Sequence, residues 1–402
     1  MKKKIIFLES ILKGGGGHHM DNLIETTLFF KKNNNIKWIV NENFKKEKLF
    51  IPDDIEINKL INEVNSNTFF NLFKKFKIFF QSFLFFLKER KLIKFFKTFI
   101  ENYFTLPDFF NLETFNYINK HNFTQEDIII IQSCRPKDIE LIFFISQLVE
   151  KMPKIIMRIL YPPKKKIFKD FYYHTKKLSK KRNVKIFTEV STIKNYIKSK
   201  LDFDVKNFNQ IYSFYQRNIP KKFTLGFLGE TRIDKGFNRL PNIIKILTEK
   251  NIQCNFLIQF SKNIYPNTHD VKNKILGMAK YNSNLKIIDG YVDFWDYRKY
   301  LKEINIMPLF YNPDKLNFVG SGLFYSCITH EIPMIVPNKA DLLNEYLAYN
   351  SFEKATTDNE YVNAISKIIN NYESYLEECK KFSKNYYQNL KKDPLVLEVE
   401  KN

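Results

Sequence analysis

The segment 223–236 constrains the fold of this chain more than any other. It reads FTLGFLGETRIDKG, a short apolar run that is followed by glycines and by the cations Arg232 and Lys235. An apolar run of this length is typical of a buried strand, and the glycines permit a tight turn after it. The spacing of apolar residues beyond Gly236 predicts a helix. Free amides at a helix start and two cations would together form an anion site, and an ordinary loop with two solvated cations is the alternative.

A second segment, 304–337, repeats this arrangement. The apolar run 304–308 predicts another buried strand, and after a loop the residues 320–322 (Gly-Ser-Gly) stand where a helix would begin. Their amides can then point at a phosphate group. Two such loops in one βα domain favour phosphate binding more strongly than one loop alone.

The two segments resemble the C-terminal half of GT-B glycosyltransferases, in particular glycosyltransferase family four. That family has a G-x-L-G strand end, an arginine and a Lys-Gly pair, and later a Gly/Ser-rich turn, a helix and a G-x-P motif. In this sequence those places are occupied by 225–229, Arg232, 235–236, 320–322 and 331–333. The resemblance is good over roughly residues 223–345 and holds in outline for the N-terminal half. It implies a retaining, metal-independent transferase in which Arg232 and Lys235 hold the diphosphate of a nucleotide sugar.

The sequence departs from the family at the sugar and ribose contacts. The family often carries a pair of glutamates around the helix that follows the Gly/Ser-rich turn, and the second of them holds the donor ribose. The corresponding places here fall near Phe318 and Ser326, so both carboxylates are missing. Glu331 also replaces the glycine that stands two residues before Pro333. These departures leave the fold and the diphosphate site of the resemblance intact.

The residues and the resemblance indicate the same fold class. Predicted strands and helices alternate along the chain, which is typical of α/β domains with parallel sheets. We therefore expect two doubly wound, Rossmann-like domains that face each other across a cleft, the GT-B architecture. The expected parts are an acceptor domain at 1–215 with a helical insertion at 69–100, a hinge at 216–222, a nucleotide-sugar domain at 223–370, and a helical tail at 371–402 that returns to the first domain.

The N-terminal half offers one glycine loop of its own. Four glycines at 14–17 follow the predicted strand 5–8, and His18 and His19 come next. Glycines let the backbone approach a ligand at the carboxyl end of the first strand, where open α/β sheets bind ligands. The alternative is a flexible loop without a ligand. Because a histidine can donate to a sugar hydroxyl or a phosphate near neutral pH, we predict a catalytic role for His18.

The predicted site residues fall into three groups. The predicted catalytic residues are His18, Arg232 and Lys235. The predicted donor and diphosphate contacts are Gly15, Gly16, Gly17, Gly229, Arg232, Lys235, Gly320, Ser321, Gly322 and Leu323. The predicted base and ribose contacts are Tyr291, Val292 and Ser326, where Tyr291 offers a stacking face. No metal ligand set is expected, since the D-x-D at 202–204 is a common chance match that lacks its usual surroundings, and no cofactor besides the nucleotide sugar is required.

The segment 69–99 has a composition unlike the rest of the chain. It is dense in Phe and Lys and free of Gly and Pro, and its Phe residues recur at helical spacing. Its uncharged stretches are shorter than the ~20 residues of a membrane-spanning helix. A Lys/Phe amphipathic helix pair can lie on an anionic bilayer, and a core stripe beneath a basic surface is the alternative.

The net charge indicates the class of binding partner, and the cysteines indicate the redox compartment. The formal net charge of +22 favours anionic partners, namely nucleotide diphosphates, phospholipid surfaces or nucleic acid. The four cysteines lack C-x-x-C spacing, which predicts buried, reduced thiols and a reducing cytosol. Glu9 interrupts an N-terminal apolar run that is too short for a signal peptide. We expect a cytoplasmic protein that can sit at the inner face of the plasma membrane.

These observations predict glycosyl transfer from a nucleotide sugar to a glycan or lipid-linked acceptor, in the synthesis of a surface polysaccharide or lipopolysaccharide-type glycan. A non-catalytic GT-B-like protein that binds sugar nucleotides or glycans is the first alternative, because the family glutamates are missing. A basic nucleic-acid-binding protein is the second. It would need an ordered cationic and aromatic surface in place of two glycine phosphate loops, so nucleic acid is not the expected partner.

Overall fold

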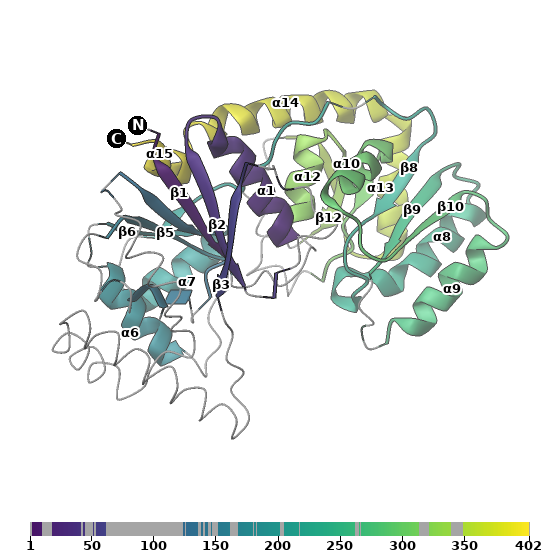
Figure 1. Ribbon diagram of the computed structural model, residues 1–402. Helices are drawn as coiled ribbons and strands as arrows, with labels where there is room; N and C mark the ends of the chain where they lie inside the picture. Colours follow the sequence, from purple (N-terminus) through teal and green to yellow (C-terminus); the bar gives the residue numbers. More distant parts are fainter. Residues whose placement is uncertain are drawn as a thin grey trace, which may run out of the picture.

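Figure 1 shows a computed structural model of the chain. It describes residues 2–9, 18–41, 43–44, 51, 54–61, 124, 126–135, 138–139, 141–143, 146, 152–160, 168–179, 181, 183–201, 205–216, 218–261, 265, 267–312, 321–338 and 349–401. Several predictions concern residues outside these ranges: the glycines Gly15 to Gly17, Gly320, the insertion 69–100 and the D-x-D at 202–204.

The N-terminal half forms a parallel sheet with a doubly wound strand order. The order is β3-β2-β1-β4-β5-β6-β7. The strands are β1 (Lys4–Glu9), β2 (Asn35–Asn41), β3 (Glu56–Ile61), β4 (Ile128–Ile131), β5 (Lys154–Ile159), β6 (Val184–Thr188) and β7 (Lys206–Asn207). The chain builds outward in one direction from β1 and in the other from β4. The carboxyl ends of these two strands therefore flank the switch point at which open α/β sheets bind ligands.

Both faces of this sheet are covered, which explains why its strands are continuous apolar runs. Helices among the described residues of this half include α1 (His18–Lys31), α6 (Phe168–Ser179) and α7 (Ser191–Leu201). Phe7 packs in one core cluster with Leu23 of α1, and Leu8 packs in another with Ile193 of α7. All four isoleucines of β4 are buried, at 0–1% exposure. Such burial on both sides fixes β4 at the centre of the sheet.

The C-terminal half repeats the same topology. The strands β8 (Thr224–Phe227), β9 (Asn255–Phe260) and β10 (Leu285–Asp289) are arranged in the order β10-β9-β8. The strands β11 (Met307–Pro308), β12 (Met334–Pro337) and β13 (Phe352–Ala355) follow in the order β11-β12-β13, and a parallel bridge from Leu225 to Ile306 joins the two sheets. The helices are α8 (Leu240–Glu249), α9 (His269–Ala279), α10 (Phe294–Glu303), α12 (Gly322–Thr329) and α13 (Asp358–Asn370). The predicted pair of doubly wound α/β units is thus confirmed.

The end of the chain runs back to the N-terminal sheet. Helix α14 (Tyr372–Leu390) spans the two halves in Figure 1, and α15 (Pro394–Glu400) lies beside β1. Tyr387 donates to the carbonyl oxygen of Tyr212 over 3.0 Å, and Lys3 Nζ lies 2.8 Å from the carbonyl oxygen of Lys401. Val396 packs in the same core cluster as Phe7. The first strand and the last helix therefore share one core.

Two properties of the described residues bear on the sequence predictions. All four cysteines are buried thiols, as predicted. None of the described helices is both long enough and apolar enough to cross a membrane.

Candidate functional site

The loop after β8 carries the two predicted cations and is shaped by two glycines. Gly229 has a φ of 109°, which other residues rarely adopt, and a β-carbon there would meet nothing within 4 Å. Its amide donates to Gln259 Oε1 over 2.9 Å, which fixes the loop to β9. Gly236 has a φ of 76°, and a β-carbon there would lie 2.2 Å from Cβ of Phe310. The loop therefore depends on glycine both for its backbone angles and for its close approach to the segment after β11.

The helix after this loop begins with 3-10 geometry and becomes an α-helix only at Leu240. Two 3-10 turns, Ile233–Lys235 and Phe237–Arg239, stand between the loop and α8, which begins at Leu240. The helical pattern predicted beyond Gly236 begins as the 3-10 turn Phe237–Arg239, with Gly236 as its N-cap, and continues as α8, where Pro241 stands in the first turn. Arg232 and Lys235 thus belong to the loop and its first 3-10 turn, and the α8 N-terminus is not beside them in sequence.

Arg232 is engaged by two carboxylates of its own loop. Its Nε donates to Asp234 Oδ1 over 2.9 Å, and NH1 lies 3.2 Å from Glu230 Oε2. The hydrogen bond with Asp234 is the main reason why the pKa of Arg232 lies above its usual range. Its side chain is 39% exposed. A diphosphate that binds this guanidinium would therefore have to compete with Asp234 and Glu230.

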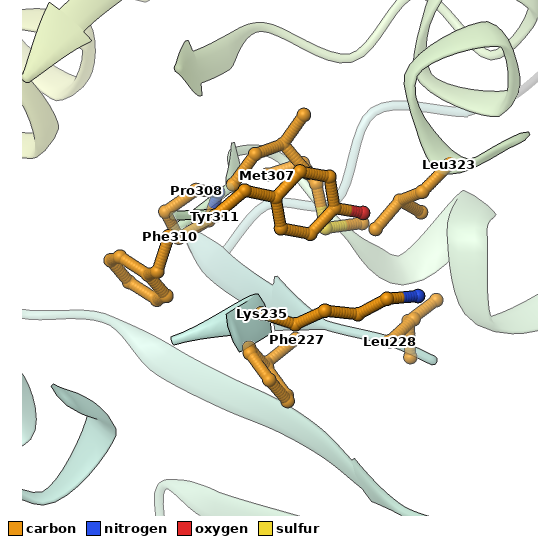
Figure 2. Close-up of a pocket in the computed structure, with 9 residues that line it drawn as sticks. Phe227, Leu228, Lys235, Met307, Pro308, Phe310, Tyr311 and Leu323 are labelled. Atoms are coloured by element: carbon orange, nitrogen blue, oxygen red, sulfur yellow. The ribbon is translucent and has the colours of Figure 1, made fainter. Parts of the chain in front are cut away.

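Lys235 lies in a hollow between the loop and the segment after β11 (Figure 2). Its Nζ is 5.8 Å from the centroid of the Tyr311 ring, within the range of a cation–π contact. The other lining residues are mostly apolar: Phe227, Leu228, Met307, Pro308, Leu309, Phe310 and Leu323. An ammonium group in such a setting is well placed to meet an anion that enters from solvent.

The first turn of α12 borders the same hollow. The helix begins at Gly322 with Ser321 as its N-cap, which confirms the helix start predicted there. Ser321 Oγ accepts from the amide of Phe324 over 3.3 Å and lies 3.2 Å from the hydroxyl of Tyr311. Leu323 lines the hollow opposite Lys235. Of the predicted donor contacts, Lys235 and Leu323 line this hollow, and Ser321 contacts Tyr311 at its edge.

The three predicted base and ribose contacts lie in different settings. Tyr291, after β10, is 39% exposed, and burial together with the negative charges of Asp21 and Asp293 raises its pKa. Val292 is partly buried against the core. Ser326 is 2% exposed, and its hydroxyl donates to the carbonyl oxygen of Gly322 over 3.0 Å. Burial of this kind does not support a ribose contact at Ser326, whereas Tyr291 has a free face.

Asp21 is a functional candidate that sequence reasoning missed. It lies in the first turn of α1, and burial raises its pKa to about 6, aided by Glu25 and Asp293 and opposed by Arg298. Asp293 and Arg298 belong to the C-terminal half, so this carboxyl group faces the boundary between the halves. An Asp near a helix start is common, and no signal in the sequence distinguishes this one.

A row of buried polar side chains marks the carboxyl ends of the central N-terminal strands. The register, which pairs Phe7 with Ile130 and Ile131 with Met157, places Glu9, Gln132 and Arg158 side by side. These three residues are only 2%, 1% and 1% exposed. The main-chain N–H of Gln132 donates to Glu9 Oε1 over 2.6 Å. Burial raises the pKa of Glu9 to about 8, with a smaller contribution from Asp138.

His19 stands next to this row. Its Nδ1 lies 2.9 Å from the hydroxyl of Ser133, which follows β4. Burial lowers the pKa of His19 to about 4; Arg158 and Arg135 add to this effect, and Glu230 opposes it. Because Glu230 also contacts Arg232, the imidazole and the predicted diphosphate loop lie within electrostatic reach of each other. His18, the predicted catalytic residue, opens α1, and nothing is described of its side chain.

Within the described ranges, no group of three or more His, Cys, Asp and Glu side chains is placed to hold a metal ion. The site residues described above are cations, hydroxyls, an imidazole and carboxyl groups with raised pKa values. The cations of the C-terminal half can bind an anion. The imidazole and the carboxyl groups of the N-terminal half can exchange hydrogen bonds with uncharged hydroxyl groups.

No protein-family model matches the sequence, and a search of curated proteins also gives no match. Solved structures match over nearly the whole chain. Anabaena HepE in complex with UDP has 9% identity and a TM-score of 0.64, and the match covers 99% of this chain and 97% of that one. A glycosyltransferase from Rickettsia africae has 12% identity and a TM-score of 0.60, with 100% and 99% covered. A mutant of S. aureus TarM, in complex with fondaparinux, α-GlcNAc-glycerol and UDP, has 12% identity and a TM-score of 0.61, with 99% and 98% covered.

At such low identities these matches establish the architecture. Each match covers both halves of the chain. The chain therefore has the two-domain α/β fold of the GT-B glycosyltransferases.

Proposed function

We propose that this protein transfers a glycosyl group from a nucleotide sugar to a hydroxyl group of a glycan or lipid-linked acceptor. The observation that carries the proposal is the hollow shared by Lys235, Tyr311 and Leu323. Lys235 from one predicted phosphate loop and Leu323 from the first turn of α12 both line this hollow, which supports a donor site there. The UDP and UDP-glucose complexes of HepE, which has the same fold, support a uridine diphosphate carrier.

The chemistry of this site suits a departing diphosphate. Negative charge gathers on the diphosphate as the sugar leaves, and fixed positive groups that meet this charge lower the barrier. Lys235 and the amides at the start of α12 supply such groups. Arg232 would join them when its contacts with Asp234 and Glu230 are exchanged for phosphate oxygens. The resemblance to family four supports retention of configuration and a reaction without a metal ion.

The domain roles and the location are part of the same proposal. The C-terminal unit from residue 223 binds the donor, the N-terminal unit up to residue 215 binds the acceptor, and 216–222 is the hinge between them. The segment 69–99 lies outside the described residues, and its composition supports docking of the acceptor domain on an anionic membrane at the cytoplasmic face.

A second candidate function is donor binding without transfer. The contacts of Arg232 with two carboxylates favour it, since they compete with phosphate, and so does the absence of the family glutamates. The two candidates differ in one measurable quantity, the release of nucleoside diphosphate from a bound donor.

The proposal is tested by binding and turnover with a panel of nucleotide sugars that includes UDP-glucose. Lys235→Ala should weaken UDP binding by about tenfold or more, because it removes a charge-assisted contact. Lys245→Ala is the matched control, since Lys245 is an exposed lysine (68%) on α8, outside the hollow. Equal UDP affinity in wild type and Lys235→Ala would contradict the donor site. Binding without any release of UDP would favour the second candidate.

A further inference from the structure

The two sides of the hollow come from segments that are far apart in the sequence. Lys235 lies in the loop after β8, and Tyr311 lies in the segment after β11, with its ring centroid 5.8 Å from Nζ of Lys235 (Figure 2). A main-chain hydrogen bond of 2.9 Å joins their neighbours, from the amide of Asn312 to the carbonyl oxygen of Asp234. The geometry of the hollow therefore depends on how these two segments are held against each other.

Arg239 contacts both segments. It belongs to the 3-10 turn that follows Gly236, and its own amide donates to the carbonyl oxygen of Gly236 over 3.0 Å. Its guanidinium carbon lies 5.8 Å from the centroid of the Phe310 ring, which directly precedes Tyr311 in the chain. Gly236 and Phe310 are themselves packed so closely that a β-carbon on Gly236 would lie 2.2 Å from Cβ of Phe310. Arg239 thus packs on the residue against which the cation loop closes.

Helix α13 and the residues before it fix the orientation of this guanidinium. Nε of Arg239 donates to Oδ1 of Asp358 over 2.6 Å, and NH2 donates to the carbonyl oxygen of Thr356 over 2.8 Å. The side chains of Arg239 and Asp358 are only 20% and 24% exposed. Oδ2 of Asp358 accepts in turn from the side-chain amide of Asn242 in α8 over 2.6 Å. Because both oxygens of this carboxylate are engaged, the fork of Arg239 has a defined direction.

Tyr361, one turn further along α13, braces the second segment. Its ring centroid lies 4.7 Å from the guanidinium carbon of Arg239 and 4.7 Å from the centroid of the Phe310 ring. Its buried hydroxyl donates to the carbonyl oxygen of Leu309 over 2.8 Å. Leu309 and Phe310 both line the hollow, whereas the described lining does not include Arg239. Arg239 therefore reaches the donor site through the residues that it holds.

We propose that Arg239 is a positioning residue of the donor site, with Asp358 and Tyr361 of α13 as its partners. Its planar fork holds the turn that carries Lys235 and the segment that carries Tyr311 in one arrangement. Lys235 is then in place before the diphosphate binds, and a pre-organised contact costs less to form than one that must be ordered on binding. This inference rests on the proposed function and adds to it a residue that contacts neither the donor nor the acceptor.

The decisive experiment is a double-mutant cycle on UDP affinity with Arg239→Met and Lys235→Ala. Arg239→Met by itself should weaken UDP binding severalfold. Lys235→Ala should weaken it by about tenfold in the wild-type background. In the Arg239→Met background the same change should weaken it by about threefold or less, because Lys235 is no longer held in place. A residue that only stabilises the fold would leave the effect of Lys235→Ala at its wild-type size.

Arg239→Lys separates position from charge. Lysine keeps the positive charge but lacks the planar fork that reaches Asp358 and Thr356 together. This variant should therefore bind UDP about as weakly as Arg239→Met does.

Two further variants complete the design. Tyr361→Phe keeps the ring and removes one hydroxyl group, so it perturbs the same network with less risk to folding, and it too should reduce the effect of Lys235→Ala. Lys286→Met in β10 is the matched control. It also removes a cation that is paired with a carboxylate, Glu303, over 2.8 Å and placed over a tyrosine ring, and it lies outside the hollow. Its UDP affinity should equal that of the wild type, and a loss as large as in Arg239→Met would contradict the inference.

The inference is overturned if Arg239→Met or Arg239→Lys binds UDP as the wild type does. It is also overturned if Lys235→Ala keeps its full effect in the Arg239→Met background, and the proposed function then still stands. If Arg239→Met does not fold, the cycle of Tyr361→Phe with Lys235→Ala decides by the same criterion. A wild-type protein that does not bind UDP, or a Lys235→Ala variant that binds it equally well, overturns the proposed donor site itself, and the inference with it.

Discussion

Arg298 of α10 and Glu25 of α1 form a buried ion pair between the two halves of the chain. NH2 of Arg298 lies 2.6 Å from Oε1 of Glu25, and the two side chains are 2% and 0% exposed. The same carboxylate accepts from the amide of Ser213 over 2.9 Å and from the hydroxyl of Tyr215 over 2.7 Å. The carboxylate of Glu25, in the N-terminal half, therefore contacts both α10 and the connecting segment just before the predicted hinge.

We predict that breaking this pair destabilises the protein strongly. Arg298→Met leaves Glu25 buried without its cation, and removal of one partner of a buried pair costs about 3–5 kcal/mol. Urea unfolding should show the loss in the free energy of unfolding. Lys299→Ala is the control on the same helix, because its pair with Asp296 is exposed (73% and 47%) and should contribute little. Equal stability of Arg298→Met and wild type would show that the pair does not hold the halves together.

Glu9 predicts a specific pH dependence of stability. Its pKa is about 8 in the folded protein against an ordinary value of 4.5, so the folded state keeps a proton that the unfolded chain releases. The resulting stabilisation is complete below about pH 4.5 and is lost as the pH rises through 8. Glu9→Gln is neutral at every pH and should flatten this fall, which can reach a few kcal/mol.

The measurement is urea unfolding of wild type and Glu9→Gln at pH 6 and pH 9. Glu189, with a pKa raised by burial to about 7, adds a fall of the same sign, so some slope should remain in the variant. Glu249→Gln, which alters an exposed carboxylate on α8, should follow the wild type. If wild type and Glu9→Gln lose stability in parallel between these pH values, Glu9 is ionised in the folded protein.

Gly236→Ala should disrupt the loop that carries the cations. The φ of 76° is unfavourable for alanine, and the new β-carbon would lie 2.2 Å from Cβ and 2.4 Å from the carbonyl oxygen of Phe310. Both effects act on the same loop, so UDP affinity and thermal stability should fall together. Gly277→Ala in α9 meets nothing within 4 Å, and a helical alanine should be neutral or stabilising by up to about 1 kcal/mol. Wild-type UDP affinity in Gly236→Ala would mean that the loop is not part of the donor site.

The segment 69–99 predicts binding to anionic vesicles. Phe insertion supplies apolar burial, and each Lys near the surface adds about 1 kcal/mol of attraction. The protein should sediment with phosphatidylserine-containing vesicles and far less with neutral ones, and salt should weaken this binding without abolishing it. Replacing Lys74, Lys77, Lys88 and Lys91 with Gln should reduce vesicle binding and leave UDP affinity unchanged. If the wild-type protein does not sediment with anionic vesicles at low salt, the membrane interpretation is wrong and the Phe residues of this segment form a core stripe.

Local sequence determined the elements and the loops that carry the predicted diphosphate site. The apolar run 128–131 is a buried central strand, and Ser321 caps the helix that starts at Gly322. These features are encoded within a few neighbouring residues, as burial patterns, turn glycines and caps. The close approach of Gly236 to Phe310, by contrast, joins residues 74 positions apart and is not visible in the sequence.

Tertiary structure alone decided the partners of the charged and polar side chains. Ser133 lies 114 positions from His19, and Arg298 lies 273 positions from Glu25, so no spacing rule could pair them. These contacts arise because strand order brings the carboxyl ends of β1, β4 and β5 together and seats α1 against the C-terminal half. Burial at those places then sets protonation, as the lowered pKa of His19 and the raised pKa of Glu9 show. Sequence specifies which groups are present, whereas the fold fixes which of them lose water and meet each other.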